Sequence, residues 1–124
     1  MGNELVVIIE DSALNRKLLR DVLTAMGYSV AEAVTAEEGL EIVRARTPNL
    51  VLMDVHLPGM DGITALRHLK QDPATQAIPV VAVTASSMPQ ERTRIVSAGF
   101  DGYLTKPLSV REFLTEIKRI LGSS

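Results

Sequence analysis

Leu5-Val6-Val7-Ile8-Ile9-Glu10-Asp11, close to the start of the chain, joins five aliphatic residues to two carboxylates. A short, unbroken aliphatic run of this kind is typical of a strand that is buried on both faces. The residues after it change to helical spacing, with apolar side chains at Leu14, Leu18, Leu19, Val22, Leu23 and Met26. Because Gly27 is a common helix terminator, the stretch predicts a strand, two acidic residues at its carboxyl end, and then a helix.

The same alternation recurs four more times along the chain. Apolar runs predict four further strands, at 28–33, 50–53, 79–83 and 103–104. Helical patterns follow them, and the starts of these helices are marked by capping boxes at 35–38 and 109–112, a turn at 58–62, and Pro89. Repeated βα units with apolar strands imply a parallel sheet that is covered on both faces. We therefore expect an α/β fold with a doubly wound, five-stranded parallel sheet of the flavodoxin-like type, in strand order 2-1-3-4-5.

Length and composition limit the class of protein. The 124 residues fit one domain, spanning residues 1–124, with a core that needs no disulfides. A formal net charge of -2, from 13 basic and 15 acidic residues, disfavours direct binding of nucleic acid. The chain contains no cysteine, which excludes disulfide scaffolds and thiol catalysis. Because neither a basic signal-peptide start nor an apolar stretch of about 20 residues is present, we expect a cytoplasmic protein without a membrane anchor.

Acidic residues follow two strands that are neighbours in the expected sheet. Glu10 and Asp11 come after the first strand, and Asp54 comes directly after the third. Ligands of such sheets bind beyond the carboxyl ends of the strands where the winding direction reverses, which here lies between these two strands. Three carboxylates form a hard-oxygen site suited to Mg²⁺. An alternative is that these acids only start helices, which would explain Asp11 but not Asp54, because several loop residues separate Asp54 from the next helix.

Four segments in order resemble one known family. They are Glu10-Asp11, the segment Leu52-Met53-Asp54-Val55-His56-Leu57-Pro58-Gly59-Met60-Asp61-Gly62, the segment Val83-Thr84-Ala85, and Tyr103-Leu104-Thr105-Lys106-Pro107. Together they are similar to the receiver domain of bacterial two-component response regulators, over a stretch from the first strand to the last helix. The residues at 81–85 and 109–121 further resemble single-domain regulators of the DivK type.

The resemblance implies a phosphoacceptor rather than an enzyme. In such a domain, Asp54 takes a phosphoryl group from a phosphohistidine of a sensor histidine kinase or histidine phosphotransferase. Mg²⁺ would be held by Asp11, Asp54 and the backbone carbonyl of His56, with Glu10 acting through water. Lys106 would pair with a phosphoryl oxygen. The resemblance also implies a cis bond between Lys106 and Pro107.

A switch is implied as well. By resemblance, phosphorylation draws Thr84 and the loop beginning at Ala85 inward, and Tyr103 moves into the vacated space. The surface of the fourth helix, the fifth strand and the last helix would then bind a downstream protein target. Ordinary strand propensity of Thr84 and half-buried packing of Tyr103 are the simpler readings of these two residues. The family also uses the positions of His56 and Ser86 to set how long the phosphoryl group lasts.

Two other functions compete with this interpretation, and a third reading keeps the receiver identity but makes the chain part of a longer protein. A phosphohydrolase of the haloacid dehalogenase type also uses a strand-end Asp and Mg²⁺, but it needs a second acid where His56 stands. A flavodoxin-like cofactor carrier needs a phosphate-binding loop after the first strand, where this chain has Glu10 and Asp11. The chain could also be a receiver fragment of a hybrid histidine kinase or of a longer transcription regulator.

Overall fold

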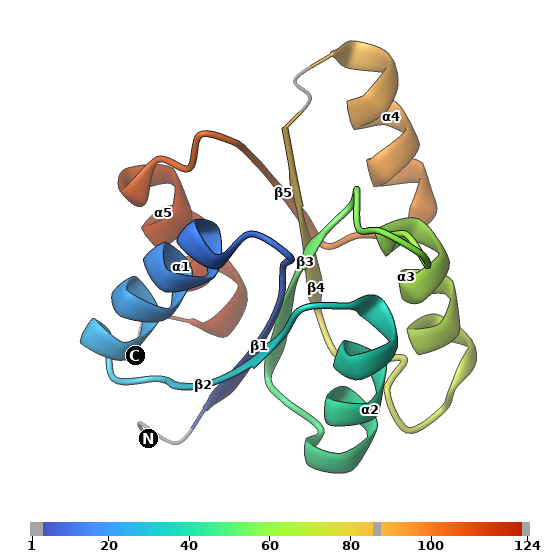
Figure 1. The fold of residues 1–124 in the computed structure, drawn as a ribbon, viewed down its shortest axis with the longest axis horizontal. Coiled ribbons are helices and arrows are strands. Elements are labelled where there is room, and N and C mark those ends of the chain that lie inside the picture. The colour runs from blue at the N-terminus through green and yellow to red at the C-terminus, as the bar shows by residue number, and fades with distance from the viewer. Residues whose placement is uncertain (1–3, 86–87, 123–124) are drawn as a thin grey trace.

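The computed structural model describes residues 4–85 and 88–122, and strands alternate with helices throughout (Figure 1). The strands are β1 (Leu5–Ile9), β2 (Ser29–Ala33), β3 (Leu50–Asp54), β4 (Val80–Thr84) and β5 (Gly102–Thr105). The helices are α1 (Ala13–Ala25), α2 (Ala36–Arg46), α3 (Gly62–Gln71), α4 (Pro89–Ala98) and α5 (Val110–Leu121). None of the helices in the described residues combines the length and the hydropathy that a membrane span requires.

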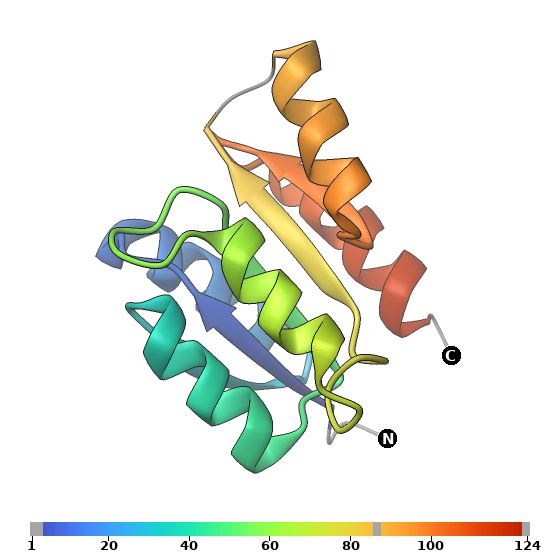
Figure 2. The same ribbon diagram turned by 90° about the vertical axis from the view of Figure 1, so that its right-hand side faces the viewer.

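All strands pair in parallel in the order β2-β1-β3-β4-β5, which confirms the expected flavodoxin-like sheet. Helices α1 and α5 cover one face, and α2, α3 and α4 cover the other (Figures 1 and 2). In β1, Val6 and Ile8 pack towards α1 and α5, whereas Val7 and Ile9 pack towards α2 and α3. This two-sided burial explains why the strand is aliphatic at every position rather than at alternate positions.

The strands β3, β4 and β5 each end one residue later than the apolar runs of the sequence predict. Asp54 is the last residue of β3 and pairs in register with Val83, and Thr84 is the last residue of β4 and pairs with Thr105. Each of these polar residues is held by pairing with one parallel neighbour, Asp54 with β4 and Thr84 with β5. Their side chains therefore start from rigid strand positions at the carboxyl edge of the sheet.

The helix caps are mostly those that the sequence predicts. The hydroxyls of Thr35 and Ser109 accept hydrogen bonds from the backbone N–H groups of residues 38 and 112, and Asp61 caps α3 at 2.8 Å through the N–H of Thr64. Leu14 keeps the helical spacing that predicts α1, but its side chain is 77% exposed in the first turn of that helix.

Candidate functional site

The carboxyl ends of β1, β3 and β5 bring the predicted polar side chains to one edge of the sheet. The Nζ atom of Lys106 lies 2.9 Å from Oδ2 of Asp54. The same atom lies 3.0 Å and 3.3 Å from the two carboxylate oxygens of Glu10. One carboxylate oxygen from each of Glu10, Asp11 and Asp54 lies within 4.8 Å of the others. Residues separated by up to 96 positions in the chain therefore form one cluster.

Burial makes this cluster electrostatically unusual. Glu10 is 1% exposed and Asp54 is 4% exposed, whereas Asp11 lies at the surface. Burial raises the pKa of Glu10, and the charge of Asp54 adds to this effect, while the N–H of Ser12 and the ammonium of Lys106 oppose it. Burial would lower the pKa of Lys106, but its hydrogen bonds to Asp54 and Glu10 outweigh burial and raise it. The ammonium therefore stays charged and offsets part of the repulsion between the carboxylates.

Backbone groups fix the orientation of both buried carboxylates. The N–H of His56 donates to Oδ1 of Asp54 at 2.9 Å, and the N–H of Ser12 donates to Oε2 of Glu10 at 3.0 Å. The hydroxyl of Ser12 also caps α1, so Asp11 is not the residue that starts this helix. The N-cap of α1 is therefore Ser12 and not Asp11.

Two residues at the site have no signal in the sequence pattern. The guanidinium of Arg16 donates to the backbone carbonyl of Glu10 at 2.9 Å and also pairs with Glu32 of β2 at 3.5 Å. Gly62, the first residue of α3, lies so close to β3 that a Cβ there would be 2.6 Å from the backbone oxygen of Asp54. Both contacts cross between elements, and neither changes the local periodicity from which elements are predicted.

We expect Gly62→Ala to lower the free energy of unfolding by about 1–3 kcal/mol, because the new methyl group must displace the backbone of Asp54. The sign is the informative part, since Gly→Ala inside a helix normally stabilises by about 1 kcal/mol. Urea denaturation measures the change, and Ser97→Ala on the exposed face of α4 is a matched control. A Gly62→Ala variant as stable as the wild type would contradict the close approach.

The remaining predicted residues lie around the cluster in different ways. Thr84 is fully buried, and its carbonyl accepts a hydrogen bond from the N–H of Lys106 at 2.8 Å. Ala85 is exposed directly after β4, and the Lys106–Pro107 bond is cis, as the resemblance implies. Ser86 lies outside the described residues. Thr84 is thus linked through its backbone to the residue that carries the ammonium.

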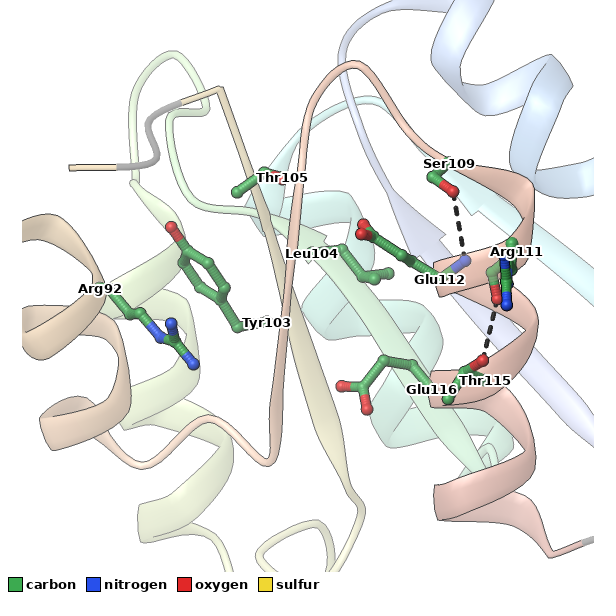
Figure 3. Close-up of a pocket in the computed structure, with 9 residues that line it drawn as sticks. All are labelled: Arg92, Tyr103, Leu104, Thr105, Ser109, Arg111, Glu112, Thr115 and Glu116. Carbon is green, nitrogen blue, oxygen red and sulfur yellow. Dashed lines mark hydrogen bonds between the residues drawn. The ribbon is translucent and has the colours of Figure 1, made fainter. Parts of the chain in front are cut away.

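Tyr103 belongs to a separate surface. It lines a pocket of about 680 Å³ between α4, β5 and α5, where the guanidinium of Arg92 lies 5.7 Å from the centre of its ring (Figure 3). The carboxylates of Glu112 and Glu116 extend from α5 into this pocket (Figure 3). Tyr103 is half-buried, and it lines this pocket rather than the cluster formed by Glu10, Asp11 and Asp54.

The donor set of the cluster fits a hard divalent cation. Carboxylate oxygens of Glu10, Asp11 and Asp54 converge without any histidine or cysteine ligand in this group. Few carboxylates, one of them at the surface, suit Mg²⁺ because that ion retains several waters. His56 follows Asp54 closely, and its side chain is 54% exposed and turned to Glu91 of α4 at 2.9 Å. The imidazole of His56 is therefore engaged away from the cluster.

Comparison with known proteins agrees with this geometry. The family model of the response regulator receiver domain matches residues 6–118. The chain is 40% identical to the polar-differentiation response regulator DivK of Brucella ovis over 119 residues, which cover 96% of this chain and 97% of that protein.

Solved structures share the fold. The receiver domain of a sensor histidine kinase from Pseudomonas aeruginosa PAO1, solved with a magnesium ion in its active-site cleft, has a TM-score of 0.89 at 26% identity and covers 98% of this chain and 99% of its own. The chemotaxis protein CheY4 of Vibrio cholerae has a TM-score of 0.88 at 22% identity, covering 94% of this chain and 98% of its own. The family match and the DivK similarity, on a fold with these strand-end acids, show that this chain belongs to the response regulator receiver domain family of two-component signalling.

Proposed function

We propose that Asp54 is the phosphoacceptor of this receiver domain and that the reaction depends on Mg²⁺. The observation that carries this proposal is the position of the Asp54 carboxylate, 2.9 Å from the Lys106 ammonium and within the group formed with Glu10 and Asp11. A carboxylate held between a cation site and a fixed ammonium is suited to receive an anionic group. The donor class is a phosphohistidine of a sensor histidine kinase or histidine phosphotransferase.

The transfer itself balances without another reactant. A carboxylate oxygen of Asp54 bonds to phosphorus while the phosphorus–nitrogen bond of the donor breaks, and the leaving imidazole takes up a proton. In this proposal, Lys106 and the hydroxyl of Thr84 would contact phosphoryl oxygens. Mg²⁺, when bound by Asp11, Asp54 and the backbone carbonyl of His56, with Glu10 through water, supplies positive charge for the carboxylate and the phosphoryl oxygens.

The proposal treats residues 1–124 as one receiver domain that acts as a cytoplasmic signalling switch and not as an enzyme with turnover. A phosphohydrolase would need a second acid two residues after Asp54. His56 stands there, and its imidazole contacts Glu91 instead of Asp54. A role as a flavodoxin-like carrier is disfavoured because the buried charge of Glu10 would repel a cofactor phosphate.

Incubation with acetyl phosphate or phosphoramidate and Mg²⁺, followed by intact mass spectrometry, tests the proposal. We expect the mass of one added phosphoryl group, and no addition after chelation of the metal, because the acidic cluster would then repel the incoming anion. Sustained release of inorganic phosphate from small phosphate esters would instead favour the phosphohydrolase. Absence of labelling in the presence of Mg²⁺ would contradict the proposal.

We infer further that the acceptor site controls the surface of α4, β5 and α5. Thr84 ends β4, and Tyr103 lies in the neighbouring strand β5. The backbone carbonyl of Thr84 accepts a hydrogen bond from the N–H of Lys106. Movement of Thr84 and Ala85 towards a phosphoryl group would open space for the ring of Tyr103, with Pro107 fixing the chain that follows Lys106. The pocket beside Arg92 would change shape, and a downstream protein target would detect that change (Figure 3).

Beryllofluoride with Mg²⁺, which imitates the phosphoryl group, should shift the amide NMR signals of α4, β5 and α5. A Thr84→Val variant keeps the shape of this buried side chain but removes the hydroxyl, so we expect it to lose most of these shifts while it still binds beryllofluoride. Thr84→Ser restores the hydroxyl and should restore the response. Unchanged signals over this surface in the wild type would overturn the switching proposal.

A further inference from the structure

His56 contacts both Asp54, the proposed phosphoacceptor, and α4, a helix of the surface proposed to bind the downstream target. The backbone N–H of His56 donates to Oδ1 of Asp54 at 2.9 Å, and its Nε2 atom lies 2.9 Å from Oε1 of Glu91. Asp54 ends β3, whereas Glu91 lies in the first turn of α4. His56 therefore connects the site to α4 directly, by a route that does not pass through Thr84 and Tyr103.

The Glu91 side chain is confined despite its place on a surface helix. It is only 14% exposed, and its Oε2 atom is held by Arg94 at 3.1 Å. Its Oε1 atom is fully buried and makes no well-aligned hydrogen bond with any described residue. Since a buried carboxylate oxygen without a partner is costly, the nearby His56 ring is the group that compensates it. Breaking this contact would release His56 and leave Oε1 of Glu91 without compensation.

We propose that the contact between His56 and Glu91 positions the backbone of His56 for metal binding and couples that event to α4. The inference rests on the proposed function, because the carbonyl of His56 is one of the proposed Mg²⁺ ligands. A residue held in place before the ion arrives loses less conformational freedom on binding, so affinity is higher. By linkage, if this position of α4 strengthens Mg²⁺ binding, then Mg²⁺ binding stabilises this position of α4 by the same free energy.

A double-mutant cycle with Mg²⁺ alone as the probe tests the coupling. We expect His56→Ala and Glu91→Gln each to raise the Kd for Mg²⁺ about two- to fivefold, and the double variant to show no further rise. In His56→Ala, the shifts that Mg²⁺ causes in the amide NMR signals of α4 should be lost, while those around Asp54 persist.

Two further variants separate contact from charge. Glu91→Asp keeps the charge but shortens the side chain, so it should weaken Mg²⁺ binding as Glu91→Gln does. Glu37→Gln removes an exposed carboxylate from the corresponding first turn of α2 and should leave the Kd unchanged. Glu91→Asp also provides a test if Glu91→Gln does not fold.

The outcomes distinguish this inference from the proposed function. Strictly additive changes in the cycle, or a wild-type Kd in Glu91→Asp, would overturn the coupling. If the wild type itself bound no Mg²⁺ and accepted no phosphoryl group, the proposed function would fail instead. Wild-type labelling at Asp54 combined with additive effects would leave the proposed function intact and refute only the role of His56 and Glu91.

Discussion

An Asp54→Asn variant is expected to take up no phosphoryl group from acetyl phosphate under conditions that label the wild type. The amide oxygen is a far weaker nucleophile than a carboxylate, and the substitution also removes one proposed ligand of the metal. Asp54 is 4% exposed and ends β3, the central strand of the sheet, so its carboxylate is held at a fixed place in the cluster. Intact mass spectrometry gives the extent of labelling, and peptide mapping of the wild type gives its position.

Asp61→Asn is the matched control, because it makes the same chemical change in the loop that follows β3. Asp61 caps α3 and does not belong to the group formed by Glu10, Asp11 and Asp54. Because Asn is also a good N-cap, the Asp61→Asn variant should fold and be labelled. Far-ultraviolet circular dichroism would show that Asp54→Asn is folded. Labelling that persists in folded Asp54→Asn would move the acceptor to another residue and refute the proposed mechanism.

Lys106→Met is expected to cause the second large effect, a loss of about 2–3 kcal/mol in the free energy of unfolding without Mg²⁺. The ammonium compensates two carboxylates whose side chains are 1% and 5% exposed, and Met leaves them adjacent without a cation. The estimate lies below that for a fully buried ion pair, because the Lys106 side chain is 19% exposed. Urea denaturation with and without Mg²⁺ measures the change.

Mg²⁺ should recover part of this loss, because a divalent ion among Glu10, Asp11 and Asp54 replaces the missing positive charge. Phosphoryl transfer should remain slow even then, by about 10- to 100-fold, since the ammonium would no longer meet the phosphoryl oxygens. Lys17→Met is the control. Lys17 pairs with Asp21 on the exposed face of α1, where such a pair contributes less than about 1 kcal/mol. Equal losses in the two variants would show that Lys106 has no special role in compensating the cluster.

The fold follows largely from local sequence patterns. The aliphatic run of β1 predicts a strand buried on both faces, and the helical spacing after it predicts α1; the structure confirms both. Parallel strands and right-handed crossovers leave few arrangements, which is why the strand order can be predicted from the sequence. Helical spacing alone does not establish burial, since Leu14 follows the spacing of α1 but its side chain is exposed.

The members of the acidic cluster were also predictable. Glu10, Asp54 and Lys106 each stand at or just beyond the carboxyl end of a strand, and the sheet topology brings such ends together. The distances of 2.9–3.3 Å between the Lys106 ammonium and the two carboxylates could not be predicted from the sequence. Periodicity contains no information about the direction of a side chain beyond the end of its strand. Sheet topology thus predicts which residues lie near one another, and side-chain packing determines which of them are in contact.

The amino-acid sequence by itself determined the order of the elements, the parallel sheet and the edge at which the polar residues gather, because these depend on periodicity, caps and chain connectivity. Only the tertiary structure decided that Arg16 holds the Glu10 carbonyl, that Gly62 lies against Asp54, and that His56 reaches Glu91. Each of these contacts joins different elements of the fold. Their geometry depends on how whole helices pack against the sheet, and that packing minimises the free energy of the entire core rather than of any local segment.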